Sequence, residues 1–220
     1  MRGLPILDLL GDLPVSGSAG PIGDGAVVLR GFAAKRTSEL LDAVERIGAA
    51  APFRRMSTPG GHTMSVAMTN CGDLGWVTDR RGYRYQSLDP LSGEPWPAMR
   101  EAFRAVATEA AAEAGYANFR SDACLINRYE PGARLTLHQD RNERDMCAPI
   151  VSVSLGLPAT FLFGGAQRRD RPRRMRLDHG DVVVWGGPTR LFFHGVEALD
   201  DGWHAATGRC RINLTFRKAG

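Results

Sequence analysis

Two histidines and one aspartate are the residues of this 220-residue chain best suited to hold a metal ion. His138 and Asp140 stand two positions apart in the run LTLHQD, so on a strand both side chains project from one face. His194 ends a second apolar run, LFFH. Two histidines and a carboxylate are the ligand set of non-haem Fe(II) sites, which leave positions open for a cosubstrate and oxygen. Taken singly, the HxD tripeptide also arises by chance, and His194 could be an ordinary core residue.

A second candidate site lies in the run CRINLTFR, residues 210–217, where polar and apolar residues alternate strictly. Arg211, Asn213 and Arg217 share one face of the expected strand. This face is either an ordinary solvent-facing surface or the lining of a pocket for a small dianion, because arginine binds carboxylates at two points. The two arginine backbones stand about 20 Å apart, so both reach one small diacid only if their side chains lean together. Asn127 and Tyr129 share a face of another strand and are either further pocket residues or residues with partners in the sheet.

The elements that must position these residues are mostly short strands. Turn pairs such as Pro131-Gly132 and Gly164-Gly165 separate eight expected strands, at residues 123–129, 134–139, 150–155, 160–163, 174–177, 181–185, 191–194 and 210–216. Apolar periodicity predicts helices at 38–47 and 97–114, the second with Pro97 at its first position. We therefore predict a mainly β member of the α+β class, with a jelly-roll (double-stranded β-helix) core at about 122–217 and N-terminal helices.

Composition fits one domain of an ordinary globular protein, with 43% apolar and 24% charged residues. Residues 1–25 are expected to be a loose N-terminal leader and 26–220 a single domain. No apolar run approaches the ~18 residues of a membrane helix, and the N-terminus does not read as a secretory signal. The four cysteines form no CxxC pair, so reduced thiols in the cytoplasm are expected and a zinc site is not.

Arginine is strongly favoured over lysine, which occurs only as Lys35 and Lys218 among the 28 cationic residues. This excess points either to contact with nucleic acid or to the codon bias of a GC-rich genome. Six arginines cluster between Arg168 and Arg176, in a loop between two expected strands. We interpret that cluster as a phosphate-contacting loop, with a merely solvated loop as the alternative.

Several long runs carry a resemblance to a known family. They are PFRRMSTPGGHTMSVAMTNCGDLGW, ACLINRYEPGARLTLHQD, VSVSLGLPATFLFGG, HGDVVVWGG, RLFFHG and CRINLTFR. Together they resemble the AlkB family of Fe(II)- and 2-oxoglutarate-dependent dioxygenases, which repair alkylated nucleic-acid bases. The similarity is collinear from about Ala26 to the C-terminus.

The resemblance implies a role for each matching residue. It makes His138, Asp140 and His194 the iron ligands, and it places 2-oxoglutarate against Asn127, Tyr129, Arg211, Asn213 and Arg217. It also implies a nucleotide-recognition lid at about 53–90, in which short strands are expected at 63–68 and 83–86. The implied substrate-binding residues are Thr58, Met64, Met68, Trp76, Tyr83, Tyr85, Asn142 and Arg168. In this scheme Trp76 and His138 lie on either side of the flipped base. From the residues themselves, Trp76 could equally be a core anchor, and the two tyrosines ordinary strand aromatics.

The implied reaction is oxidative demethylation of 1-methyladenine- and 3-methylcytosine-type bases in DNA, and of RNA if RNA is accepted. It uses Fe(II), 2-oxoglutarate and O2 and releases formaldehyde, succinate and CO2. A monomer acting preferably on single strands, away from membranes, is expected.

Asn142 departs from the family, whose members of bacterial origin carry Asp there, so a shifted preference among lesions is predicted. The alternatives are a 2-oxoglutarate oxygenase acting on a protein or small molecule, and a non-catalytic jelly-roll binding module.

Overall fold

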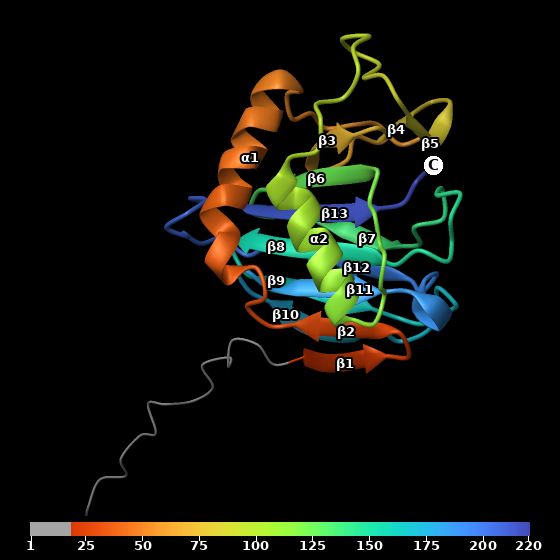
Figure 1. Ribbon diagram of the computed structural model, residues 1–220. Helices are drawn as coiled ribbons and strands as arrows, with labels where there is room; N and C mark the ends of the chain where they lie inside the picture. The colour runs from red at the N-terminus through yellow and green to blue at the C-terminus, as the bar shows by residue number, and fades with distance from the viewer. Residues whose placement is uncertain (1–18) are drawn as a thin grey trace, which may run out of the picture.

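The computed structural model describes residues 19–220 as two β-sheets stacked face to face, with two helices on the outer face of the larger one (Figure 1). The larger sheet has seven strands in the order β1-β2-β11-β8-β13-β6-β3, and the smaller has four in the order β10-β9-β12-β7. A separate hairpin, β4-β5, lies beside the edge strand β3. All pairings are antiparallel, which confirms the mainly β jelly-roll prediction.

The strands are short and follow one another along most of the chain. The larger sheet contains β1 (Ala19–Gly23), β2 (Ala26–Leu29), β3 (Ala67–Gly72), β6 (Ala123–Tyr129), β8 (Ile150–Gly156), β11 (Val182–Trp185) and β13 (Arg211–Arg217). The smaller sheet contains β7 (Leu135–His138), β9 (Ala159–Phe163), β10 (Arg173–Leu177) and β12 (His194–Val196), and the hairpin consists of β4 (Gly75–Asp79) and β5 (Gly82–Gln86). The helices are α1 (Thr37–Ala50) and α2 (Glu101–Glu113).

Period-two alternation sorts the side chains of the larger sheet into two cores. On β13, Ile212, Leu214 and Phe216 face outward and pack with the apolar sides of α1 and α2. The alternate residues of the same strand face inward, toward the smaller sheet, and all of them are buried. The polar face of CRINLTFR is therefore an interior surface, and the solvent-facing alternative is wrong.

Two element boundaries differ from the prediction because backbone groups have other partners. Helix α2 begins at Glu101, whereas Pro97 lies before it and accepts a hydrogen bond from the Gly72 amide at 2.9 Å. The strand expected at 191–194 is displaced, because Gly187–Thr189 form a 3-10 turn and the Phe192 amide bonds back to Thr189. His194 consequently begins strand β12 rather than ending a strand.

The N-terminal half shows two further differences. Residues 19–23, expected in the loose leader, form β1 and pair with β2, while the remainder of that leader lies outside the described residues. The strand expected at 63–68 is found at Ala67–Gly72, because Thr63 instead makes an isolated bridge to Ser57. The strand expected at 83–86 is confirmed as β5.

The segment expected to be a lid, residues 53–90, is anchored at its base by a partly buried ion pair. Arg54 binds both carboxylate oxygens of Asp89 at 2.8 and 2.7 Å, and its guanidinium lies over the ring of Trp96. The indole of Trp96 donates to the carbonyl of Gln86, the last residue of β5. These contacts tie the two ends of the segment to each other and to Trp96. We call residues 53–90 the cover segment.

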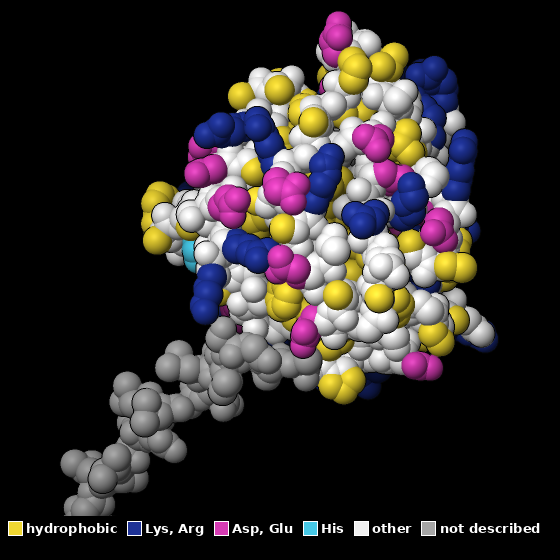
Figure 2. Space-filling view, in the orientation of Figure 1, with side chains coloured by type: hydrophobic (Ala, Val, Ile, Leu, Met, Phe, Trp, Pro, Cys, Tyr) yellow, Lys and Arg dark blue, Asp and Glu magenta, His cyan; other side chains and the backbone are white. Residues whose placement is uncertain are grey.

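The helix-bearing face shows no single-sign charged patch. Cationic and acidic side chains are interspersed over α1 and α2 (Figure 2), and Arg36 of this region pairs with Glu109. No helix within residues 19–220 is long and apolar enough to cross a membrane.

Helix α2 provides a test of the outer core. Phe103 is fully buried and packs edge-to-face on Phe216 of β13, with ring centroids 5.6 Å apart. Replacing Phe103 with Ala is expected to lower the free energy of unfolding by about 3–5 kcal/mol, through lost transfer energy and the cavity left behind. Glu113→Ala, at an exposed position of the same helix, should stay within about 0.5 kcal/mol. Urea denaturation measures both, and equal stability of the two variants would contradict this packing.

Candidate active site

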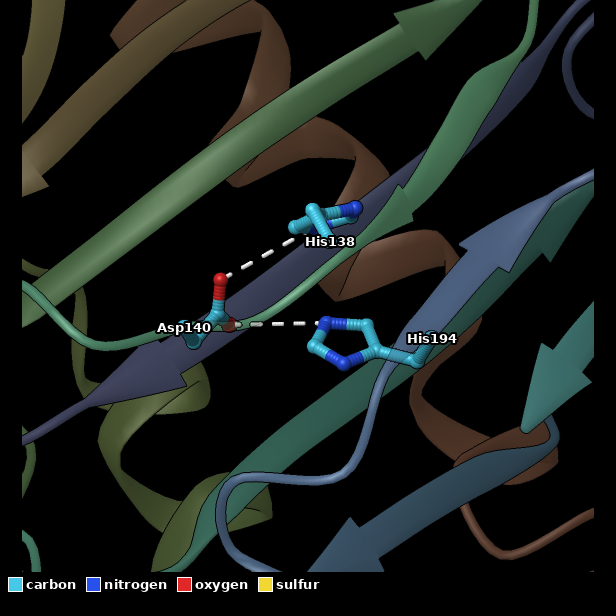
Figure 3. A group of neighbouring side chains, drawn as sticks. All are labelled: His138, Asp140 and His194. Atoms are coloured by element: carbon cyan, nitrogen blue, oxygen red, sulfur yellow. Dashed lines mark ion pairs between the residues drawn. The ribbon is translucent and has the colours of Figure 1, made fainter. Parts of the chain in front are cut away.

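The three predicted metal-binding residues meet where strands β7 and β12 of the smaller sheet pair (Figure 3). His138 ends β7, Asp140 follows it in the next loop, and His194 begins β12, which pairs with β7 so that the two histidines are directly opposite. One ligand atom from each residue lies within 4.8 Å of the others, and each Nε2 is 3.8 Å from a carboxylate oxygen of Asp140. Side chains at this spacing can close on a single ion.

The hydrogen bonds of the two histidines leave the atoms facing the centre free to bind a metal. Nδ1 of His138 lies 2.8 Å from the Thr136 carbonyl, and Nδ1 of His194 lies 3.0 Å from the Phe192 carbonyl. A carbonyl oxygen can accept a hydrogen bond but cannot donate one, so Nδ1 of each ring carries the hydrogen. In the neutral imidazole, Nε2 then keeps its lone pair. His179 has the opposite arrangement, because its Nδ1 accepts from the Gly156 amide. Its Nε2 therefore carries the proton, which argues against a metal-binding role.

Charge and burial also prepare the triad for a cation. Burial, together with the neighbouring His138, lowers the pKa of His194 to about 4, so its imidazole is neutral near pH 7. Burial acts to raise the pKa of Asp140, but the positive charge of Arg217 and its hydrogen bond to the carboxylate outweigh burial and hold that pKa well below its usual range. The site therefore presents a neutral imidazole and an ionised carboxylate, which are the forms that bind a metal.

Arg217 contacts the metal ligand Asp140 directly. Its Nε and Nη2 donate to Oδ2 of Asp140 at 3.0 and 2.7 Å. Burial acts to lower the pKa of Arg217, but Asp140, Tyr85 and Glu143 outweigh it and raise that pKa further above its ordinary value. The assignment of Arg217 to a carboxylate of the dianion stays a prediction beside this contact. In the structure Arg217 orients the aspartate.

A cavity of about 540 Å³ extends from the triad between the two sheets. The inward faces of β6, β8 and β13 line its floor, and the triad and the cover segment line its mouth. All five residues predicted to hold a cosubstrate line this cavity: Asn127, Tyr129, Arg211, Asn213 and Arg217. The fold therefore brings the two candidate sites of the sequence together in one space.

Arg211 is the residue of this cavity that most requires a ligand. Its side chain is 1% exposed, its Nη2 donates to Ser154, and its Nε and Nη1 have no partner. Its guanidinium lies over the Tyr129 ring, 5.1 Å from the centroid, which is a weak substitute for a counter-charge. A buried cation with two unused donors is costly unless an anion binds it. A carboxylate bound at two points fits this arrangement.

The remaining polar residues of the floor form one hydrogen-bonded network. Asn213 accepts from Asn127 at 3.2 Å and donates to Ser152 at 2.8 Å, and Thr215 donates to Asn213 at 2.9 Å. Burial raises the pKa of Tyr129 to about 12, so its hydroxyl keeps its proton and can donate. The network is rigid and polar, as binding a small polar cosubstrate requires.

The cover segment supplies an aromatic and thioether wall to the mouth of the cavity. Trp76 of β4 and Tyr83 of β5 stack, with ring centroids 5.7 Å apart and planes tilted by 20°. Trp76 is held through its backbone, whose amide and carbonyl both bond to the side chain of Asn70 at 3.0 Å. Thr58, Met64 and Met68 line the same wall, and Asn142 and Arg168 line the cavity from the loops of the core.

Of the predicted substrate-binding residues, Tyr85 is the one that does not line the cavity. Its hydroxyl donates to Glu143 at 2.7 Å, and burial raises its pKa well above the usual range. The Tyr85 hydroxyl thus bonds to the protein itself, whereas the sequence analysis placed this residue against nucleic acid. Tyr83, two residues earlier, is 46% exposed and remains available.

Sequence reasoning also missed residues that hold the site together. Ser152 and Ser154 alternate with apolar residues in VSVSL, a signal of the same kind as CRINLTFR that could have identified them. Glu143 and Arg190 are buried and bonded to one another. Nothing in a single sequence separates such a pair from ordinary surface charges, because its partners are distant along the chain.

Comparison with known proteins agrees with this geometry. The family model of the 2OG-Fe(II) oxygenase superfamily matches residues 25–217. The alpha-ketoglutarate-dependent dioxygenase AlkB of Salmonella typhimurium is 59% identical over 199 residues, covering 90% of this chain and 92% of that protein. The human nucleic acid dioxygenase ALKBH1 is 33% identical over 123 residues, covering 56% and 31%.

A solved structure extends the agreement to the fold. The structure of OsALKBH1 superimposes with a TM-score of 0.80 at 26% identity, covering 91% of this chain and all of that one. The chain therefore belongs to the 2OG-Fe(II) oxygenase superfamily and, within it, to the AlkB family of α-ketoglutarate-dependent dioxygenases.

Proposed function

We propose that this enzyme demethylates N-alkylated nucleic-acid bases of the 1-methyladenine and 3-methylcytosine class. The observation that carries the proposal is one cavity with a His-Asp-His triad at its mouth and an unpaired, buried Arg211 on its floor. The first suits Fe(II), and the second suits a carboxylate of 2-oxoglutarate. A non-catalytic binding module would need neither feature.

The bound metal and cosubstrates supply the oxidising power: O2 and 2-oxoglutarate yield succinate and CO2 as an N-methyl carbon is hydroxylated and lost as formaldehyde. The chain's own residues bind and orient. His138, Asp140 and His194 hold the metal, and Arg217 fixes the aspartate. Arg211 and the amide and hydroxyl groups of the floor hold the cosubstrate and exclude water from it.

The wall formed by the cover segment favours a base over a protein or a small metabolite as substrate. A base acted on outside its helix is bound between aromatic or apolar side chains. Trp76 and Tyr83 offer such a surface across the cavity mouth from His138. A 2-oxoglutarate oxygenase acting on another substrate class would share the triad and Arg211 without needing this wall.

The proposal extends to the strandedness of the substrate and to the setting of the enzyme. Extruding a base costs least in a single strand, so we place single-stranded DNA first, with RNA as a further candidate. We also propose that the enzyme acts as a monomer. The four free cysteines suit the reducing cytoplasm.

The arginine cluster, which was expected in a loop, runs from the loop after β9 into strand β10 and supports contact with the nucleic-acid backbone. Arg174 and Arg176 pair with Glu197 and Asp178. Arg168 lies over the Phe193 ring at the cavity mouth. The other arginines of the cluster, Arg169, Arg171 and Arg173, are exposed and have no carboxylate partner among residues 19–220. Their charge remains available for phosphates.

Removing a metal ligand tests the activity itself. The wild-type protein is incubated with Fe(II), 2-oxoglutarate, O2 and a methylated single-stranded oligonucleotide. Mass spectrometry should show that the oligonucleotide loses about 14 mass units per methyl group with the wild type and none with His138→Ala. The matched control is His204→Ala, at a histidine outside the cavity, which should retain activity. An inactive wild type, no better than His138→Ala, would overturn the proposal.

The unpaired guanidinium predicts where the cosubstrate binds. Arg211→Lys keeps the charge but loses the two-point geometry, worth about 1.5–3 kcal/mol for a charged hydrogen-bonding group. The KM for 2-oxoglutarate should rise roughly 10- to 100-fold, with the KM for the oligonucleotide little changed. Arg209→Lys, at an exposed ion pair with Asp201, should leave both values unchanged. An unchanged 2-oxoglutarate KM in Arg211→Lys would contradict the assignment.

Asn142 predicts the choice of lesion. It lines the cavity mouth as a neutral amide, with Arg141 and Arg168 also lining that cavity. Asn142→Asp adds a negative charge, so turnover of cationic 1-methyladenine should rise relative to 1-methylguanine by about tenfold, or ~1.4 kcal/mol. Competition between the two bases in one oligonucleotide measures this ratio. The same ratio in wild type and variant would refute a role in lesion choice.

A further inference from the structure

A buried cluster of charged groups lies beside the cavity and reaches it through Arg217. Its centre is Glu143, whose side chain is 2% exposed. One carboxylate oxygen, Oε1, accepts from the hydroxyl of Tyr85 at 2.7 Å and lies 3.4 Å from Nε of Arg217. The other, Oε2, accepts from Nη2 of Arg190 at 3.2 Å. A carboxylate this deeply buried is stable because three partners surround it.

The Tyr85 side of this cluster belongs to the β4-β5 hairpin. A two-stranded hairpin is marginally stable by itself, so its position depends on contacts to the rest of the fold. Asn70 holds the Trp76 end of β4. The Tyr85 hydroxyl reaches from β5 to the loop that follows β7, which carries both Asp140 and Glu143. This bond joins the hairpin to the metal-binding loop.

The other side of the cluster leads to Asp140 by two routes. Arg217 donates to the Asp140 carboxylate at 2.7 Å and lies beside Glu143. Arg190 binds Glu143 and also donates to the Asp140 backbone carbonyl at 2.7 Å and to Ala148 at 3.0 Å. Side chain and backbone of the metal ligand are therefore both fixed by arginines that share Glu143 as a partner.

We propose that Glu143 is a positioning residue that ties the β4-β5 hairpin, through Tyr85, to the Arg217–Asp140 pair. The proposal rests on the proposed function, since it takes Asp140 as a metal ligand. Glu143 does not line the cavity, so it acts through its partners and not on the substrate. Tyr85 accordingly belongs to the support of the site and not to its nucleic-acid contacts.

The hairpin side of the link can be tested without any metal. Tyr85→Phe removes one hydroxyl, and backbone hydrogen exchange of residues 75–86 should rise about tenfold. Tyr83→Phe is the matched control, because that hydroxyl lies on the same strand and has no hydrogen-bond partner among the described residues. It should change exchange less than twofold. Glu143→Gln should raise exchange as well, and Tyr85→Phe added to Glu143→Ala should raise it no further.

The effect of the cluster on the metal site is measured by titrating the same variants with Mn(II). Glu143→Ala, or Glu143→Gln if the alanine variant does not fold, should weaken Mn(II) binding about tenfold, and Tyr85→Phe less than threefold. Unchanged hairpin exchange in Tyr85→Phe, additive effects in the double variant, or wild-type Mn(II) affinity without Glu143 would each overturn the proposal. Equal Mn(II) binding by wild type and His194→Ala would instead overturn the metal site, while the exchange results would still decide the hairpin link.

Discussion

The ion pair between Asp140 and Arg217 is the interaction on which the site depends. An aspartate buried among two histidines would lose its charge unless a cation stabilised it, and Arg217 does so at 2.7 Å. The pair links the loop after β7 to the last residue of β13, 77 positions along the chain. Removing one partner of such a pair typically costs about 3–5 kcal/mol, because the other charge remains buried. The metal site and the sheet are thus stabilised by the same contact.

The polar face of β13 imposes a second constraint on the fold. Strict alternation places arginine, asparagine and threonine in the interior on one side and aliphatic residues under the helices on the other. Most of these polar groups bond to one another, but two donors of Arg211 have no partner. A fold that retains an unpaired buried cation has given up stability at that position, as is typical of a site built for an anionic ligand.

Local periodicity explains which parts of this description were predictable from sequence. Alternation in CRINLTFR is enough to place its residues on two faces, and the series of short strands is enough to predict the jelly roll. Asp140 does lie beside His138, but it does so from the loop after β7 and not from a shared strand face. The start of β12 at His194 depends on a 3-10 turn that apolar periodicity does not reveal. The Glu143 cluster joins five residues from four parts of the chain, and no local pattern marks it.

Much of the arginine excess also has a structural use, since Arg30, Arg54, Arg190 and others pair with carboxylates.

The central claim is that the triad and the floor of the cavity form one site, in which the metal and the cosubstrate bind side by side. Calorimetric titration with Fe(II) in the absence of oxygen, with and without 2-oxoglutarate, tests it most directly. We predict one equivalent of Fe(II) per chain and tighter 2-oxoglutarate binding once the metal is present. Both effects should be lost in His194→Ala, and the coupling should be weakened in Arg211→Lys. Fe(II) binding of equal affinity in wild type and His194→Ala, or 2-oxoglutarate binding indifferent to the metal, would contradict the account.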